Sequence, residues 1–247
     1  MAGHSKWANI KHRKAVTDAR RGKLFTQASK EIIVAARLGG GDPDANSRLR
    51  MAIQNARSVS MPADNIKRAI QRGTGEIEGV TYEDVTYEGY GPGGVAVIVE
   101  CTTENRNRTV QEVRATFAKY GGSLGENNSV SWNFTRVGEI QLETTTSEET
   151  LLEHAIDAGA NNVEYYSDAE NGQGAMVYCT VEALQSVSQQ LESQGHLLVE
   201  QRLAYIPSTT VEVKDLELEK KLRKLLDVFD DNDDVRHVFH NAELLDE

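Results

Sequence analysis

The apolar residues between positions 137 and 206 change their spacing in an order that few folds can accommodate. Short apolar runs predict strands at "GEIQLET", "NVEYYS", "GAMVYCTVE" and "LLVEQRLAYIP", and helical spacing predicts helices at "SEETLLEHAIDAGA" and "ALQSVSQQLESQG". The order strand, helix, strand, strand, helix, strand is that of the ferredoxin-like fold, in which two helices cover one face of a four-stranded antiparallel sheet. We therefore predict a self-contained domain over residues 137–206.

The segments on either side of this domain are interpreted as two parts of one further domain. Residues 83–102 predict a hairpin that turns at "GPGG", and "ENRNRTVQEVRATFAKYGG" predicts a helix with Thr109 and Glu112 at capping-box spacing. "VSWNFTR" predicts a strand, and the tail adds one helix and one strand from Val235. We predict a second ferredoxin-like domain, residues 81–136 plus 207–247, with the first inserted into it.

The remaining residues, 1–80, predict a basic arm followed by a domain of three short helices. The first helix is expected in "KLFTQASKEIIVAARLGGG", the second after Asp42-Pro43, and the third from near Pro62 until Gly73 ends it. In the first helix Lys23, Lys30 and Arg37 recur every seven residues on the side opposite Ile32, which predicts one packed face and one positive face. The whole chain is thus expected to be a multidomain α+β protein.

Charge is divided unevenly along the chain, whose formal net charge is -11. Residues 1–72 contain 15 Lys or Arg and 5 Asp or Glu, whereas the remainder contains 12 basic and 33 acidic residues. Any single charge of this kind is ordinarily a solvated surface group, but a solvated surface mixes both signs. A basic module on an acidic body therefore favours a nucleic-acid partner.

The candidate nucleic-acid contacts lie in the arm, on the predicted helices and in "ENRNRT". They are Lys6, Trp7, Lys11, His12, Arg13, Lys14, Arg20, Arg21, Lys23, Lys30, Arg37, Arg68, Arg72, Arg106 and Arg108. The ring of Trp7 suits stacking on an unpaired base, with the alternative that it pins the arm to the helices. Arg106 and Arg108 either line the same cleft as the other cations or form the surface of a helix start.

The acidic tail and the cysteines do not predict a metal, a cofactor or an enzyme. "DDNDD" lacks the glycine of a calcium loop, since Val235 stands there, and His237 and His240 do not share a strand face. Cys101 and Cys179 lie in separate apolar runs and are expected to be reduced, buried thiols. The sequence contains no readable catalytic triad, nucleophile elbow or dinucleotide fingerprint.

The lengths of the apolar runs bear on the expected location of the protein, because a membrane span and a secretory signal each require a long apolar segment. No run approaches the roughly 18 apolar residues of a membrane span, and the basic start is not followed by the apolar segment of a secretory signal. We expect a cytoplasmic protein with no membrane partner, and its oligomeric state is left open.

Several motifs resemble the YebC family over essentially the whole chain. They are "MAGHSKWANIKHRK", "DARRGKLFTQASKEI", "AARLGGGDPDANSRLR", "MPADNIKRAIQRG", "YEGYGPGG", "ENRNRT" and "GGSLGENNSVSWNF". The resemblance implies three domains and a cytoplasmic protein described as a probable transcriptional regulator, with some members binding promoter DNA. The family is also similar to a mitochondrial translational activator, and bacterial relatives are linked to ribosomes and to relief of stalling at proline-rich sequences.

Three functions follow from these observations. The first is a DNA-binding transcriptional regulator that holds the phosphate backbone with its basic arm and helices. The second is a translation factor on ribosomal or transfer RNA, where shape recognition replaces base reading and the acidic domains face away. The third, a ligand sensor or scaffold, rests on fold alone.

Overall fold

A computed structural model describes residues 18–143, 146–168 and 172–244 of the chain. Contacts between the described residues divide the chain into two units, one containing residues 18–135 and 206–244 and the other containing Arg136–Tyr205. Helices and antiparallel sheets are mixed, with a helical region at the N-terminal end, so the predicted α+β class is confirmed. The finer division of the first unit into a helical and a split domain stays a prediction.

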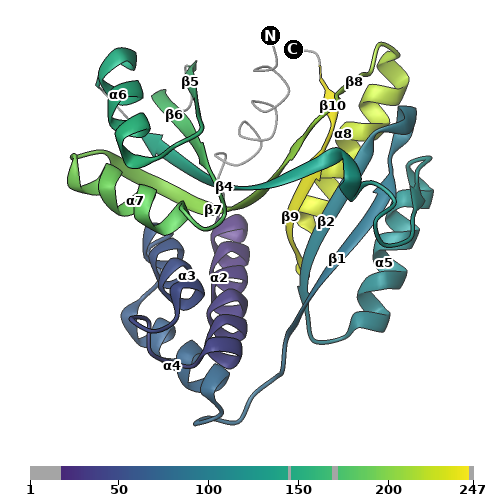
Figure 1. Cartoon of the computed structure of the whole chain (residues 1–247). Helices are drawn as coiled ribbons and strands as arrows, with labels where there is room; N and C mark the ends of the chain where they lie inside the picture. The colour runs from purple at the N-terminus through teal and green to yellow at the C-terminus, as the bar shows by residue number, and fades with distance from the viewer. Residues whose placement is uncertain (1–17, 144–145, 169–171, 245–247) are drawn as a thin grey trace. The chain divides into compact units, whose positions relative to one another are not determined.

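The N-terminal helices are α2 (Asp18–Gly39), α3 (Ser47–Ser58) and α4 (Ala63–Thr74), and α2 packs against the other two (Figure 1). Ile32, Leu49 and Ala56 are fully buried at their shared core. The second helix begins at Ser47, later than Pro43, because the Asn46 side chain caps it by accepting the N–H of Leu49 at 3.0 Å.

The sequence predicts that Gly73 ends the third helix, but Gly73 lies inside that helix. The helix continues to Thr74 and is ended by Gly75, whose φ of 82° is left-handed. A Cβ at Gly73 would lie 2.5 Å from the backbone oxygen of Ile33 and 2.7 Å from the Cβ of Ala36. Gly73 therefore permits the close approach of α4 to α2.

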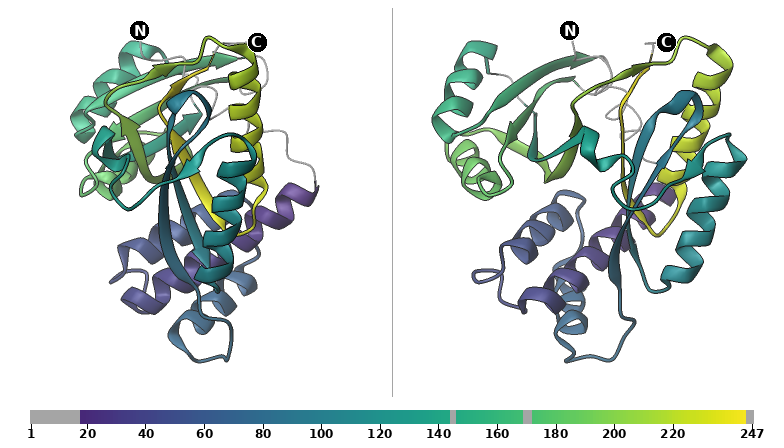
Figure 2. Two further views of the ribbon diagram at one scale, coloured as in Figure 1. Left: turned by 90° about the vertical axis from the view of Figure 1, so that its right-hand side faces the viewer. Right: turned by 45° about the vertical axis from the view of Figure 1, so that its right-hand side comes forward.

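The part of the first unit that follows the helical region, called the split domain below, is a four-stranded sheet covered on one face by two helices. Its strands are β1 (Glu83–Tyr90), β2 (Ala96–Thr103), β3 (Ser123–Leu124) and β9 (Val235–His240), in the order β3-β1-β2-β9. The helices are α5 (Arg106–Lys119) and α8 (Leu216–Asp231), which lie on the same side of this sheet (Figure 2). Short elements complete it: η1 (Pro92–Gly94) at the hairpin turn and the parallel pair β8 (Val211–Glu212) and β10 (Ala242–Glu243).

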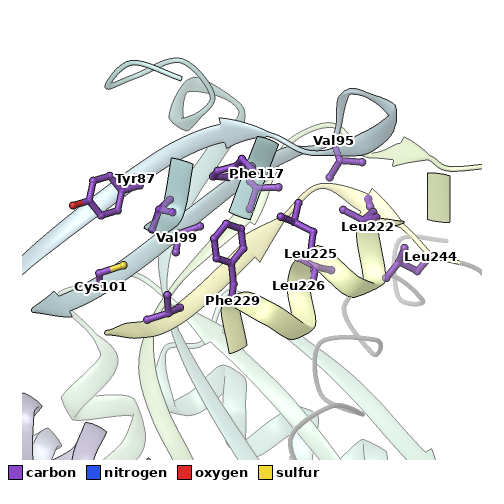
Figure 3. Packing of buried hydrophobic residues seen from close by; sticks show 14 of the residues in the cluster. Tyr87, Val95, Val99, Cys101, Phe117, Leu222, Leu225, Leu226, Phe229 and Leu244 are labelled. Atoms are coloured by element: carbon purple, nitrogen blue, oxygen red, sulfur yellow. The ribbon is translucent and has the colours of Figure 1, made fainter. Parts of the chain in front are cut away.

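The core of the split domain lies between its sheet and its two helices. The rings of Phe117 on α5 and Phe229 on α8 meet edge to face with centroids 5.0 Å apart, and Val99 and Cys101 point toward them from β2 (Figure 3). Both Cys101 and Cys179 are buried and unpaired, as the sequence predicts.

Two local predictions in this domain are wrong. Within "VSWNFTR", Ser131–Asn133 is a single 3₁₀ turn, η2, and the strand that begins at Phe134 belongs to the sheet of the second unit. The short strand β3 lies at the edge of the sheet, next to β1, instead. Helix α5 is capped by Asn105, whose side chain accepts the N–H of Arg108, and Thr109 is buried inside the helix.

The second unit has the ferredoxin-like order of elements. It contains β4 (Phe134–Glu143), α6 (Glu148–Ala158), β5 (Asn162–Asp168), β6 (Gly172–Cys179), α7 (Leu184–Ser193) and β7 (Leu197–Pro207). The sheet order is β5-β6-β4-β7, with the first and third strands of the domain at the centre. Ile140, Leu151 and Leu191 are fully buried, joining the sheet to both helices.

None of the helices in the described part of the chain combines the length and the apolar character needed to cross a membrane.

Candidate nucleic-acid interface

The predicted contact residues fall into three groups by position. Lys6, Trp7, Lys11, His12, Arg13 and Lys14 lie outside the described residues. Arg20 and Arg21 belong to the first turn of α2. The remaining candidates, from Lys23 to Arg108, have described side chains, and the structure separates those already bonded within the protein from those that are not.

The positive face of α2 is bound by the protein's own acidic body. The ammonium of Lys23 donates to the backbone oxygen of Asp230, and Nη1 of Arg37 donates to the backbone oxygen of Tyr82 at 3.2 Å. Between them, Gln27 Nε2 donates to the oxygen of Val235 at 2.6 Å. The positive face of α2 is therefore packed as well, because it lies on the split domain.

Lys30, in the middle of that face, is buried with 7% of its surface exposed. Its Nζ donates to the backbone oxygens of Thr102 at 3.3 Å and Asp233 at 2.9 Å and to Oδ1 of Asp234 at 3.0 Å. A lysine ammonium has three donors, and all three are used here. We therefore correct the assignment of Lys30 as a phosphate contact.

Asp234 is the acceptor at the centre of this contact. Its Oδ2 accepts Nη2 of Arg108 at 2.9 Å and the hydroxyls of Thr103 at 3.1 Å and Thr109 at 2.8 Å. Burial raises the pKa of this carboxyl, but the bonds from Arg108, Lys30 and Thr109 outweigh burial and lower its pKa to about 2. Arg108 is thereby engaged in a structural ion pair.

Arg106, the neighbour of Arg108, lies at the exposed start of α5. Its backbone oxygen accepts the hydroxyl of Tyr87 at 3.4 Å. Within the described residues its guanidinium has no hydrogen bond or ion pair, and neither Arg106 nor Arg108 is among the residues that line the cleft at α4 described below.

A second ion network joins the helices to the sheet. Arg236 on β9 pairs with Glu31 on α2 and with Glu100 on β2, the latter at 3.2 Å. Arg48 on α3 pairs with Glu31 at 3.0 Å and with Asp84 on β1 at 2.5 Å. Burial lowers the pKa of Arg236, but the surrounding carboxylates outweigh burial and raise its pKa. Together with Lys30 and Asp234, this network fixes α2 and α3 on the split domain.

A cleft of about 380 Å³ opens between α2 and α4. Phe25 and Ser29 line it from α2, and Asn65, Arg68 and Arg72 line it from α4. Tyr82, which precedes β1, completes the wall, with the Lys30 ammonium 5.4 Å from the centroid of its ring.

The two arginines of the cleft differ from those of α2 and α3. Arg68 and Arg72 are both exposed, and four residues apart they lie on one side of α4. Within the described residues neither guanidinium makes a hydrogen bond or an ion pair. Their donors are therefore available to a ligand, and a guanidinium fork matches phosphate oxygens in a bidentate manner.

Comparison with protein families covers nearly the whole chain. Residues 5–76 match the model of the TACO1/YebC N-terminal domain, and residues 82–242 match the model of the TACO1/YebC second and third domain. The chain belongs to the TACO1/YebC family. The five residues between the two matches, 77–81, belong to the linker that leads from α4 to Tyr82.

Relatives within the TACO1/YebC family are similar along their full length. The chain is 50% identical to a "probable transcriptional regulatory protein" of Sulfurihydrogenibium, over 99% of this chain and 96% of the relative. Proteins with the same description in Chloroherpeton thalassium and Myxococcus xanthus are 51% and 48% identical, over 99% and 100% of this chain and 96% and 97% of the relatives. A crystal structure of a conserved hypothetical protein from Aquifex aeolicus superposes with a TM-score of 0.89 at 47% identity and covers 98% of each chain.

Sequence reasoning about this TACO1/YebC protein missed the acceptor Asp234 and the cleft wall at Tyr82. Asp234 stands in "DDNDD", which predicts a solvated turn, and nothing local distinguishes it from its exposed neighbour Asp233. A signal was present in the basic face of α2, because a chain with an acidic body contains its own anionic partner for such a face. Within the described residues no group of three or more His, Cys, Asp or Glu side chains is arranged to hold a metal ion.

Proposed function

We propose that this protein is a nucleic-acid-binding regulator of gene expression that contacts the phosphate backbone with its basic N-terminal arm and with helix α4. The observation that carries the proposal is the division of the cations in the helical region. The cations on the positive face of α2 are bonded to the acidic body. Arg68 and Arg72 on α4 are instead exposed, without a hydrogen bond or ion pair among the described residues, and line an open cleft.

The energetic reasoning is that unpaired, solvated cations can bind phosphate without breaking an internal contact. Lys30 would have to leave a buried carboxylate, which is costly, whereas Arg68 and Arg72 give up only water and counterions. The arm adds Lys6, Lys11, Arg13 and Lys14 in nine residues, enough for several phosphate contacts. The descriptions of the relatives as probable transcriptional regulatory proteins support a regulator of transcription.

A second candidate, a translation factor bound to ribosomal or transfer RNA, is favoured by the acidic body. The chain after Arg72 has 33 acidic and 12 basic residues, and a long duplex that extends past α4 would be repelled by it. A folded RNA that offers single-stranded loops and bulges can contact the basic region alone. The same basic surface serves both candidates, so the target distinguishes them.

The test is a binding titration of the full chain against labelled duplex DNA and single-stranded RNA over a series of salt concentrations. With about six phosphate contacts, the logarithm of the affinity for duplex should fall with the logarithm of salt at a slope near -5. Charge reversal at Arg13, Lys14, Arg20 and Arg21 should abolish binding and leave the melting temperature nearly unchanged. A flat salt response in the wild-type protein overturns the proposal.

The matched control for this series reverses charge on α8, which contributes no residue to the cleft. Lys221 and Lys224 are exposed on α8 and, within the described residues, have no ion pair. The double substitution K221E/K224E changes the net charge as much as R68E/R72E does. We expect R68E/R72E to weaken binding at least tenfold and K221E/K224E to change it little; equal effects would mean that only net charge matters.

A further inference from the structure

We propose that the cleft between α2 and α4 holds one unpaired nucleotide of a single strand, with its phosphate on Arg68 and Arg72 and its base against Phe25 and Tyr82. This inference rests on the proposed function and names the kind of nucleic acid that the site takes. It concerns the recess itself, whereas the proposed function concerns the charged surface around it.

The shape and the charge of the cleft fit a nucleotide. A volume of about 380 Å³ lies within the range of small-ligand sites. Arg68 and Arg72 are separated by one turn of α4, a rise of about 6 Å, so both guanidinium groups can converge on one phosphate. Neither has an internal hydrogen bond or ion pair among the described residues, and the wall opposite them is aromatic.

The aromatic wall is the feature that selects a base. Phe25 and Tyr82 line the recess and are each partly exposed, and both pack against the core of the helical region. The position of Tyr82 is held by its backbone oxygen, which accepts Arg37, and by the Lys30 ammonium near its ring. A base that stacks on such a ring contributes binding free energy whatever its identity, since every base has a π-face.

Polar groups that could meet the edge of a base or a sugar also line the recess. The side-chain amide of Asn65 has no hydrogen-bond partner within the described residues, and Ser29 places a hydroxyl on the α2 side. An amide offers both donors and an acceptor, and a hydroxyl offers one of each. Cation, aromatic ring and amide in one recess match the three parts of a nucleotide.

A duplex does not present these parts together. Its bases are stacked on each other and paired, so a base reaches the recess only after it is extruded, at a cost of a few kcal/mol. Single-stranded loops and ends present a free base beside each phosphate. The recess therefore favours single strands, whereas the exposed arginines alone would bind either form.

The experiment compares the affinities of ring variants for two probes under the same salt. The probes are a single-stranded RNA of mixed sequence and a blunt DNA duplex, titrated against the full chain. Tyr82→Leu should weaken single-strand binding about 5- to 100-fold and leave duplex binding unchanged, because it removes only the stacking surface. Tyr82→Phe keeps the ring and should bind as the wild type does.

Phe25→Leu provides a second ring variant, so that a folding defect at Tyr82, checked by circular dichroism, does not decide the outcome. R68Q/R72Q should weaken binding of both probes, because it removes phosphate contacts that they share. Adenosine monophosphate is the third probe; if it binds as tightly as the strand, the occupant is a free nucleotide and the single-strand inference is overturned.

The remaining outcomes separate the two proposals. If the strand and the duplex bind with salt dependence but neither ring variant changes their ratio, the recess is not a base site and only this inference fails. If the wild type binds neither probe, the proposed function fails, and this inference fails with it.

Discussion

Replacement of Asp234 by Asn tests whether this carboxylate holds the helical region on the split domain. The substitution keeps the size of the side chain but removes the charge that pairs with Lys30 at 3.0 Å and with Arg108 at 2.9 Å. Lys30, with 7% of its surface exposed, would then be a buried cation without its counterion. The expected result is a large loss of stability in the first unit.

The magnitude follows from two independent considerations. Lowering the pKa of Asp234 from 3.8 to about 2 on folding corresponds to about 2 kcal/mol of stability at neutral pH. Removal of one partner from a buried ion pair typically costs about 3–5 kcal/mol. We expect Asp234→Asn to lose about 3 kcal/mol, or roughly 6–12 °C of melting temperature for a unit of this size.

The pH dependence provides a second signature. Because the pKa of Asp234 is lower in the folded than in the unfolded protein, its contribution is complete above the unfolded value of 3.8. That contribution is lost as the pH falls from there toward about 2. The stabilities of the wild type and of Asp234→Asn should therefore converge in strong acid.

The assay is urea unfolding followed by far-ultraviolet circular dichroism, with hydrogen exchange of α2 and β9 as the local readout. Asp233→Asn is the matched control: it removes one negative charge from the adjacent, exposed residue, whose backbone oxygen still accepts Lys30. That control should change stability by less than about 0.5 kcal/mol. Equal stabilities of the two variants at pH 7 would refute the reasoning.

Three further predictions concern the packing around these contacts. Gly73→Ala should destabilise the protein by at least about 1 kcal/mol in thermal melts, because its Cβ would lie 2.5 Å from a backbone oxygen of α2. Gly22→Ala, whose Cβ would have no atom within 4 Å, should be neutral or stabilising. A Gly22→Ala variant less stable than Gly73→Ala would contradict the close approach of α4 to α2. Glu88→Gln should cost about 1–3 kcal/mol and speed hydrogen exchange in the loop after β3, whose three backbone N–H groups its carboxylate accepts; unchanged exchange would show that the carboxylate does not hold that loop. Burial raises the pKa of the Cys101 thiol to about 12 and that of Cys179 to about 11, so neither should react with a thiol reagent at pH 8 until the chain is unfolded; rapid labelling of the native protein would contradict their burial.

The ferredoxin-like unit could be predicted from the sequence because its elements are short, regular and consecutive. Each predicted strand and helix between 137 and 206 has a counterpart in the structure, from the strand that ends at Glu143 to the long strand β7. Local patterns were sufficient there, since each element carries its own apolar face.

Local patterns failed where distant residues decide the outcome. The spacing of Lys23, Lys30 and Arg37 indicates that one face of α2 is positive, but not whether its anion is a nucleic acid or the loop around Asp234. The spacing of Thr109 and Glu112 predicts that Thr109 caps α5, but the side chain of Asn105 caps it instead. The hydroxyl of Thr109 donates to Asp234, 125 residues away.

The candidate site could be predicted only in part, because periodicity places residues on a helix but does not show which distant segments lie against them. Arg68 and Arg72 follow from the periodicity of α4, and the structure leaves both exposed and unpaired among the described residues. The ring of Tyr82 reaches the cleft only because the linker after α4 turns back toward α2, which no spacing along the sequence encodes.

The most direct test of the central claim is ultraviolet crosslinking of the protein to nucleic acid in growing cells, followed by purification under denaturing conditions. Both the attached RNA and DNA are sequenced, and the crosslinked peptides are identified by mass spectrometry. The account predicts nucleic acid attached to peptides from the first 23 residues and from residues 61–82, with ribosomal or transfer RNA indicating the translation factor and discrete promoters indicating the transcriptional regulator. Recovery of no nucleic acid, or of crosslinks confined to the second unit, would contradict it.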